Sequence, residues 1–234
     1  MGKTVVVTGG TRGIGLEVVK RFVENGDQVH VIGRDFSSFP YNDNPNVQSH
    51  VYDLRDVSGI PELAKSIGDI DILINNAGIS QGKNYAEYTE EEIAGILNVN
   101  LKAPLALVKS FAAGWILKGK GRVVNVASQA SEIGHNDIWY GITKAGLVNA
   151  TKTLASELGP KGIVVNAVSP GPVQTDMTTD TTYQERYQKI ISRTYLKRIA
   201  YASEVADVIY WLATESPQYV NGENIDVNNG AQRI

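Results

Sequence analysis

Tyr140 and Lys144 are the residues of this 234-residue sequence whose types and spacing best suit proton transfer. A tyrosine and a lysine spaced i,i+4 share one face of a helix, so the ammonium can approach the phenol. A nearby positive charge favours the phenolate and lowers the tyrosine pKa from its reference value of roughly 10. Such a tyrosine can give or take a proton near neutral pH. The alternative is a solvated tyrosine and lysine on an exposed face, so the rest of the chain has to decide.

A glycine-rich stretch near the N-terminus has the context of a phosphate-binding loop. It reads Thr8-Gly-Gly-Thr-Arg-Gly-Ile-Gly15 and follows a short β-branched run at 4–8. Helical spacing of apolar residues over 13–24 and a second strand at 28–33 complete a βαβ unit. Glycines let the backbone approach a pyrophosphate, which the N–H groups of a helix N-terminus attract. The alternative is a strand–helix turn without a ligand. The residues expected to contact a nucleotide are Gly9, Thr11, Arg12, Gly13, Ile14 and Gly15.

The end of the second strand bears on the choice between NADP(H) and NAD(H). A carboxylate at this place binds a ribose 2′-hydroxyl, but the sequence has Gly33 followed by Arg34. Arg34 can clamp a 2′-phosphate through its planar fork, and Arg12 can reach the same phosphate. Asp35 argues the other way, because a shift of one residue would make it the ribose ligand. The sequence therefore favours NADP(H). Asp53, after the third strand, can accept the adenine amino group or can serve as a turn or helix-capping residue.

The remaining sequence alternates strands and helices. Between Arg34 and Asn46, two prolines and three asparagines argue for a loop or a single turn instead of a helix. Asp56 and Ser203 are expected to cap helices, and Pro104 to bend one. The expected strands are 46–52, 70–75, 121–127, 163–168 and 223–227, and the expected helices are 56–67, 89–118, 139–158 and 203–213. The sequence thus predicts an α/β fold: one Rossmann-type domain, 1–234, whose doubly wound sheet has about seven parallel strands with helices on both faces.

Composition excludes several classes of function. The net charge is −3 without a basic block, which argues against a nucleic-acid or anionic-membrane surface. The chain has no cysteine and only three scattered histidines, so thiolate chemistry is excluded and a metal site is not expected. No apolar run approaches the ~20 residues of a membrane helix. The N-terminus does not have the pattern of a signal peptide, and we expect a cytoplasmic protein.

Several separate motifs occur in one order along the chain. They are Thr8-Gly-x-x-x-Gly-Ile-Gly15, Asp53-Leu54, Asn75-Asn-Ala-Gly78, Asn98-Val-Asn100, Ser128, Tyr140-x-x-x-Lys144 and Pro170-Gly-x-Val-x-Thr175. In this combination the sequence resembles the short-chain dehydrogenase/reductase family over nearly its whole length. The resemblance implies a Rossmann-type fold and hydride transfer between a nicotinamide and a carbonyl or secondary alcohol.

The resemblance also implies a role for each catalytic candidate. Tyr140 would be the proton donor in reduction and the base in oxidation. Lys144 would lower the pKa of Tyr140 and bind the nicotinamide ribose. Ser128 would donate to the substrate oxygen, where negative charge develops. Asn100 would hold a water that links Lys144 to solvent. The alternatives are a polar kink residue for Asn100 and a turn former for Ser128.

Further cofactor contacts follow from the same resemblance. Asn75, Asn76, Ala77 and Gly78 would line the adenine ribose, with Leu54 near the adenine, and Pro170, Gly171, Val173 and Thr175 would wrap the nicotinamide. Two departures stand out: 34–46 is shorter than usual in the family, and the spacing from Ser128 to Tyr140 is slightly short. Specificity is expected from 129–139, 79–88 and the substrate segment 175–198. His135 can contact substrate, or it is an exposed loop histidine.

The substrate stays open. The sequence resembles 3-oxoacyl-[acyl-carrier-protein] reductases and general carbonyl reductases alike, and the fold does not separate them. The expected partner is a small carbonyl or alcohol. The helices at 89–118 and 139–158 are expected to form the interface of a homo-oligomer, a dimer or tetramer. One alternative is a regulatory protein that senses NADP(H) with little turnover, and another is an alcohol dehydrogenase that prefers NAD(H).

Overall fold

A single parallel sheet organises the computed structural model, which describes residues 2–174, 188 and 191–231. Within these residues, seven strands lie in the order β3-β2-β1-β4-β5-β6-β7, and every neighbouring pair is parallel. This confirms the predicted doubly wound α/β fold. The strands are β1 (Thr4–Thr8), β2 (Gln28–Gly33), β3 (Val47–Val51), β4 (Ile72–Asn75), β5 (Gly121–Val126), β6 (Ile163–Pro170) and β7 (Asn224–Val227).

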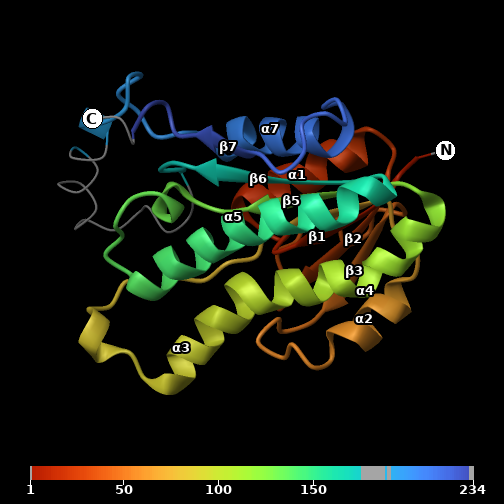
Figure 1. Cartoon of the computed structure of the whole chain (residues 1–234), viewed down its shortest axis with the longest axis horizontal. Helices are drawn as coiled ribbons and strands as arrows, with labels where there is room; N and C mark the ends of the chain where they lie inside the picture. The colour runs from red at the N-terminus through yellow and green to blue at the C-terminus, as the bar shows by residue number, and fades with distance from the viewer. Residues whose placement is uncertain (1, 175–187, 189–190, 232–234) are drawn as a thin grey trace.

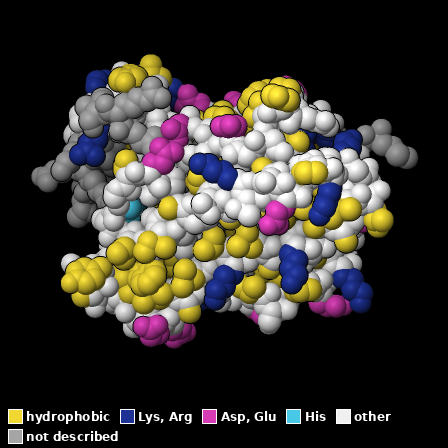
Figure 2. Space-filling view, in the orientation of Figure 1, with side chains coloured by type: hydrophobic (Ala, Val, Ile, Leu, Met, Phe, Trp, Pro, Cys, Tyr) yellow, Lys and Arg dark blue, Asp and Glu magenta, His cyan; other side chains and the backbone are white. Residues whose placement is uncertain are grey.

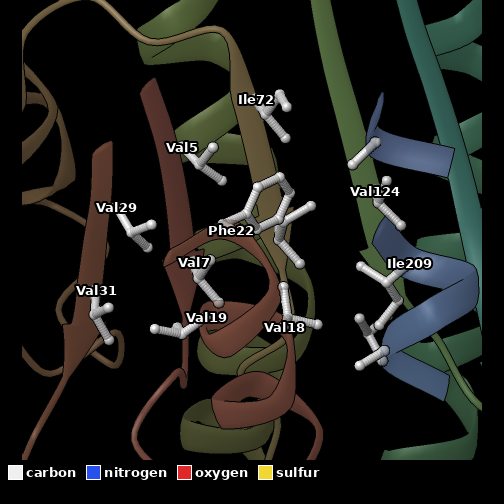
Figure 3. Close-up of a cluster of buried hydrophobic side chains, with 14 of the residues drawn as sticks. Val5, Val7, Val18, Val19, Phe22, Val29, Val31, Ile72, Val124 and Ile209 are labelled. Atoms are coloured by element: carbon white, nitrogen blue, oxygen red, sulfur yellow. The ribbon is translucent and has the colours of Figure 1, made fainter. Parts of the chain in front are cut away.

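Helices cover both faces of the sheet (Figure 1). One face carries α1 (Gly13–Glu24) and α7 (Ala202–Thr214), and the other carries α2 (Ile60–Ile67), α4 (Ala103–Lys118) and α5 (Ile138–Leu158). Side chains along β1 alternate between these two layers, because successive residues of a strand point to opposite faces. Val5 and Val7 pack with Phe22 of α1 and Ile209 of α7 (Figure 3), whereas Val6 belongs to the opposite layer. The central strands are therefore apolar throughout, as in sheets covered on both sides.

The segment between β2 and β3 forms turns without a helix, as the sequence predicts. Phe36 and Phe39 are buried and meet edge to face, with ring centroids 5.5 Å apart. Both belong to the core that includes Val19 and Val31. Two buried aromatic rings thus fill the space over β2, which explains how so short a connection still covers the sheet.

The expected single helix over 89–118 is instead divided. Thr89 caps α3 (Glu90–Leu97) through a capping box with Glu92. A π-helical turn, Asn98–Lys102, separates α3 from α4, and the Ala103 N–H donates to the Asn98 carbonyl. The predicted bend near Pro104 therefore lies one turn earlier, and Asn100 stands inside it. Pro104 has no N–H, so the α-helical bond that would end on the Asn100 carbonyl cannot form.

Other element boundaries differ from the sequence expectations. Asp56 does not cap α2, because its Oδ1 accepts from the N–H groups of Ser58 and Gly59 in a preceding turn. Ser203 lies inside α7, which begins after Tyr201, and the Tyr201 N–H donates to Glu204 Oε2. The expected partly helical segment 175–197 lies mostly outside the described residues. Across the described part of the chain, none of the helices has the length and apolar character to span a bilayer.

Candidate active site

Ser128, Tyr140 and Lys144 meet at the carboxyl ends of the central strands. Ser128 follows β5, and Tyr140 lies in the first turn of α5 with Lys144 one turn further on. The Ser128 hydroxyl is close enough to the Tyr140 hydroxyl to oppose, by hydrogen bonding, the rise in the pKa of Tyr140 that burial causes. Lys144 Nζ lies 5.7 Å from the centre of the Tyr140 ring. The helix spacing therefore places the phenol and the amine on α5, and the end of β5 adds the Ser128 hydroxyl, at the edge of the sheet where ligands bind in this type of fold.

Lys144 is a buried amine. Its side chain is 3% exposed, and Nζ donates to the main-chain carbonyl of Val126 at 2.7 Å. Burial lowers the pKa of Lys144 from 10.5 to about 8. A Cβ added to Gly78 would lie 3.2 Å from Nζ, so glycine lets the loop after β4 approach the amine. A proton on Lys144 is therefore weakly held and can be exchanged near physiological pH.

The electrostatics of Tyr140 correct one sequence expectation. Burial raises the pKa of Tyr140; the Ser128 hydrogen bond works against this rise, and the charge of Asp137 adds to it. The pKa of this tyrosine is thus raised, and the lowering expected from Lys144 is not found. The reason is geometric, since the Lys144 ammonium is directed to the Val126 carbonyl and not to the phenol. The arrangement holds the phenol in its protonated, proton-donating form.

Asn100 is fully buried in the π-helical turn and ties neighbouring segments together. Its Oδ1 accepts from the Ile79 N–H at 2.8 Å, and its Nδ2 donates to the Ile79 carbonyl at 2.9 Å. Nδ2 also lies 3.1 Å from Thr143 Oγ1 on α5. Asn100 thus links the loop after β4 to the helix that carries Tyr140 and Lys144. The water that Asn100 is expected to hold stays a prediction.

The glycine loop has a backbone conformation that is compatible with the predicted pyrophosphate site. Gly9 and Gly13 have φ values of +65° and +55°, which favour glycine. A Cβ on Gly15 would collide with the Gly9 carbonyl oxygen. Asn76 Nδ2 donates to the carbonyls of Thr8 and Gly9, at 3.0 and 3.1 Å, and these two hydrogen bonds fix the start of the glycine loop to the loop after β4. No side chain caps the start of α1 after Arg12, so its first N–H groups suit an anion.

Gly33, Arg34 and Asp35 lie at the end of β2, where the adenosine part of the nucleotide is expected. A Cβ on Gly33 would meet Thr11 Cγ2 at 3.1 Å and the Phe36 ring at 3.3 Å. Arg12 and Arg34 are both exposed. Asp35 is also exposed, and its Oδ1 accepts from the Ser37 N–H at 2.8 Å. The two guanidinium groups and this carboxylate are thus all available on the side where a nucleotide 2′ group is expected.

Asp53 has the local contacts of a turn residue. Its Oδ1 accepts from the Arg55 N–H at 3.0 Å, and its carboxylate pairs with the Arg55 side chain. These contacts fit the turn interpretation, while Leu54 is buried in the layer under α2. Asn75 is buried too, and its Nδ2 donates to Asn125 Oδ1 of the next strand at 2.9 Å. Asn75 therefore has a structural contact within the sheet.

The predicted nicotinamide side follows β6. Pro170 ends this strand, and the Gly171 N–H donates to the Val227 carbonyl at 2.9 Å. Val173 forms an isolated bridge with Ala200. Thr175 lies outside the described residues. A cavity of ≈ 260 Å³ opens here and is lined by residues including Pro172, Leu196 and Asn228. Over the described ranges, no group of three or more His, Asp or Glu side chains gathers where a metal could bind.

The loop before α5 places two residues near Tyr140. His135 is exposed in this loop, which agrees with the exposed loop histidine given as the alternative, and its ring centre lies 5.2 Å from that of Tyr140. Asp137 is fully buried, and its Oδ1 accepts from the Tyr140 N–H at 3.0 Å. An aspartate just before a helical run is the usual pattern of an N-cap, and this signal was present in the sequence.

Comparison with known proteins agrees with this geometry. Residues 9–232 match the family described as Enoyl-(Acyl carrier protein) reductase. The chain is 33% identical over 238 residues to the 3-oxoacyl-[acyl-carrier-protein] reductase FabG of Buchnera aphidicola subsp. Schizaphis graminum (strain Sg), covering 97% of this chain and 96% of that protein. A solved structure described as a short chain dehydrogenase/reductase family protein has a TM-score of 0.89 and 32% identity, covering 100% of this chain and 98% of the other.

Solved structures with this fold hold either nucleotide. The structure of ElxO with NADP bound has a TM-score of 0.88 and 27% identity, with 100% of each chain covered. A 4-hydroxyisoleucine dehydrogenase complexed with NADH has a TM-score of 0.94 and full coverage of both chains, but at 24% identity it shows the likeness of fold alone. These comparisons support binding of a nicotinamide dinucleotide without deciding between the two.

Proposed function

This chain belongs to the short-chain dehydrogenase/reductase family of NAD(P)-dependent oxidoreductases, and we propose that it reduces a carbonyl with NADPH, Tyr140 being the proton donor. The observation that carries the proposal is the meeting of Ser128, Tyr140 and Lys144 at the carboxyl edge of the sheet. The loop after β4 connects this cluster to the glycine loop, because Asn76 bonds to Gly9 and Gly78 lies against Lys144. In this proposal the glycine loop and the start of α1 would hold the phosphates of the dinucleotide, and the residues around Tyr140 would hold its nicotinamide.

Each side chain has a defined task in this proposal. The nicotinamide, when bound, supplies or accepts the hydride. Tyr140 gives its phenolic proton to the carbonyl oxygen in reduction and takes the proton back in oxidation. Ser128 donates a hydrogen bond to the same oxygen, where negative charge develops. Lys144 would bind the nicotinamide ribose, and its lowered pKa of about 8 makes proton exchange at the site easy near neutral pH.

Residues at both ends of the site suit the cofactor. Gly9, Gly13 and Gly15 leave room for the backbone to approach a pyrophosphate, and the uncapped start of α1 attracts its charge. Gly33 leaves no carboxylate at the end of β2, and the exposed Arg34 and Arg12 can pair with a 2′-phosphate. These features support NADP(H) over NAD(H). The competing proposal, an NAD(H)-preferring alcohol dehydrogenase, rests on the exposed carboxylate of Asp35.

The proposed substrate is a small ketone or aldehyde, and 3-oxoacyl thioesters are the first candidates because the relative from Buchnera is named as a reductase of that class. The experiment is a scan of short ketones, aldehydes and 3-oxoacyl thioesters with NADPH and with NADH, following nucleotide absorbance. Turnover with NADPH preferred supports the proposal. Binding of NADPH without turnover of any carbonyl would favour the alternative, a regulatory protein that senses NADP(H).

We also propose a homo-oligomer. Apolar side chains gather over η1 (Tyr85–Glu87), α3 and the start of α5 (Figure 2). Tyr85, Ile138 and Ile142 in this region are 75%, 43% and 47% exposed. Exposed apolar groups in one area are typical of an interaction surface. Light scattering at micromolar concentration should therefore show a dimer or tetramer, and a monomer would contradict this part of the proposal. A cytoplasmic location stays a prediction.

A further inference from the structure

Asp137 is a buried carboxylate that the proposed mechanism does not use. It precedes α5, is fully buried, and accepts hydrogen bonds both from the start of α5 and from the loop at 80–82. Oδ1 accepts from the Tyr140 N–H at 3.0 Å. Oδ2 accepts from Ser80 Oγ at 2.7 Å and from the Gln81 N–H at 2.8 Å.

Further donors complete the shell around Asp137. The Gly82 N–H donates to Oδ2 at 3.2 Å. The Tyr88 hydroxyl lies near the same carboxylate and helps to lower its pKa. The Tyr88 oxygen in turn accepts from the Lys83 N–H at 3.3 Å. Burial alone would favour the neutral acid, but these hydrogen bonds hold the pKa of Asp137 well below its usual range. A single charge thus fastens the loop at 80–82 to the helix that carries Tyr140.

We infer that Asp137 is a positioning residue for this reaction, an inference that rests on the proposed function. First, Asp137 fixes the loop at 80–82 relative to Tyr140, the proposed proton donor. Second, Asp137 helps to keep Tyr140 protonated. The second effect follows from charge. Asp137 Oδ1 accepts from the main-chain N–H of Tyr140, and the negative charge of Asp137 adds to the rise in the pKa of Tyr140 that burial causes. The other titratable groups facing the pair include Tyr88 from the loop before α3, His135 from the loop after β5, and Lys144 on α5.

The test replaces the charge but keeps the shape, with Asp137→Asn. The amide brings two N–H donors into a shell of donors, so the loop at 80–82 should loosen. For NADPH-dependent ketone reduction, kcat/KM should fall by on the order of 10- to 100-fold, because small misplacements of reacting groups are that costly. Without the anion the pKa of Tyr140 falls, so the alkaline limb of kcat/KM should move to lower pH. Amide hydrogen exchange at Gln81 and Gly82 should become faster.

The matched control is Asp27→Asn. Asp27 is also a buried carboxylate, 1% exposed, that accepts from the Lys3 N–H at 2.8 Å and from Asn25 Nδ2 at 3.0 Å. Asp27 lies just before β2, at the amino ends of the parallel strands, whereas Tyr140 lies at their carboxyl ends. This control should lower thermal stability while the pH profile stays in place. If Asp137→Asn matches Asp27→Asn in kcat/KM and in its pH profile, the inference is overturned.

Two milder variants keep the question decidable if Asp137→Asn does not fold. Ser80→Ala and Tyr88→Phe each remove one donor and leave the Asp137 charge in place. Each should raise KM and speed exchange at Gln81, while the alkaline limb stays fixed. Unchanged KM and exchange in both would overturn the positioning role. A wild-type enzyme that turns over no carbonyl would refute the proposed function instead, and the exchange experiment would still test the clamp.

Discussion

Replacing Lys144 with methionine should make the protein more stable at neutral pH. Lys144 is 3% exposed, and burial lowers the pKa of its amine from 10.5 to about 8. Each pKa unit is worth about 1.4 kcal/mol, so the charged amine destabilises the fold by on the order of 3 kcal/mol. Methionine removes that charge and also the hydrogen bond to Val126, which is worth about 1 kcal/mol. The net gain at pH 7 is therefore on the order of 2 kcal/mol.

The pH dependence is the sharper part of this prediction. Below pH 8 the lysine is protonated in both states, and the full cost of burying the charge is present. Between about pH 8 and 10.5 the unfolded state binds more protons than the folded state, so the wild type gains stability as pH rises. The advantage of Lys144→Met should therefore shrink by on the order of 3 kcal/mol over that range, and near pH 10.5 the variant should be less stable than wild type by about 1 kcal/mol, the worth of the lost hydrogen bond.

The assay is equilibrium urea unfolding of wild type and variant at pH 7 and pH 10. Lys152→Met is the matched control, because Lys152 lies on the same helix with its side chain exposed. That control should give the same small difference at both pH values. A Lys144→Met protein that is less stable than wild type at pH 7, or whose difference does not change with pH, would refute the assignment of Lys144 as a buried cation.

Two further changes address the cofactor. Arg34→Ala should weaken NADPH binding by on the order of tenfold or more and leave NADH nearly unchanged, because only the former has a phosphate for the guanidinium; equal losses for both nucleotides in a binding titration would contradict the clamp. Gly15→Ala should cost about 1–3 kcal/mol and weaken both nucleotides, since its Cβ would collide with the Gly9 carbonyl. Gly95→Ala is the control, because its new Cβ would meet only Arg55 Cδ, at 3.7 Å. Normal NADPH binding by Gly15→Ala would contradict the prediction that the loop fits closely around the nucleotide.

Motifs with a local physical cause could be predicted from the sequence. The β-branched run of β1, the glycine turn and the apolar spacing of α1 each specify their own structure. The short connection over 34–46 could be predicted as irregular because its prolines and asparagines oppose a helix. The i,i+4 spacing placed Tyr140 and Lys144 on one helix, and Ser128 could be placed beside them through the family resemblance.

What the sequence did not predict depends on contacts between distant segments. Pro104 indicated a bend, but the π-helical turn lies earlier, where Asn100 bonds to Ile79. Lys144 was expected to lower the pKa of Tyr140, yet its amine bonds to a carbonyl of β5 that the helix pattern does not reveal. Asp137 could be predicted as a helix cap, but its second oxygen binds a loop more than 50 residues earlier, with a separation of 57 from Ser80. Tertiary partners, not local preference, decide these three cases.

The central claim is that Tyr140 transfers the proton within a preformed nucleotide site. Its most direct test is Tyr140→Phe, measured for turnover of a ketone that the wild type reduces and for NADPH affinity by titration. Turnover should fall by on the order of 100-fold or more while the affinity changes little, because only the phenolic proton is lost. A variant that reduces the ketone at nearly the wild-type rate would contradict this account.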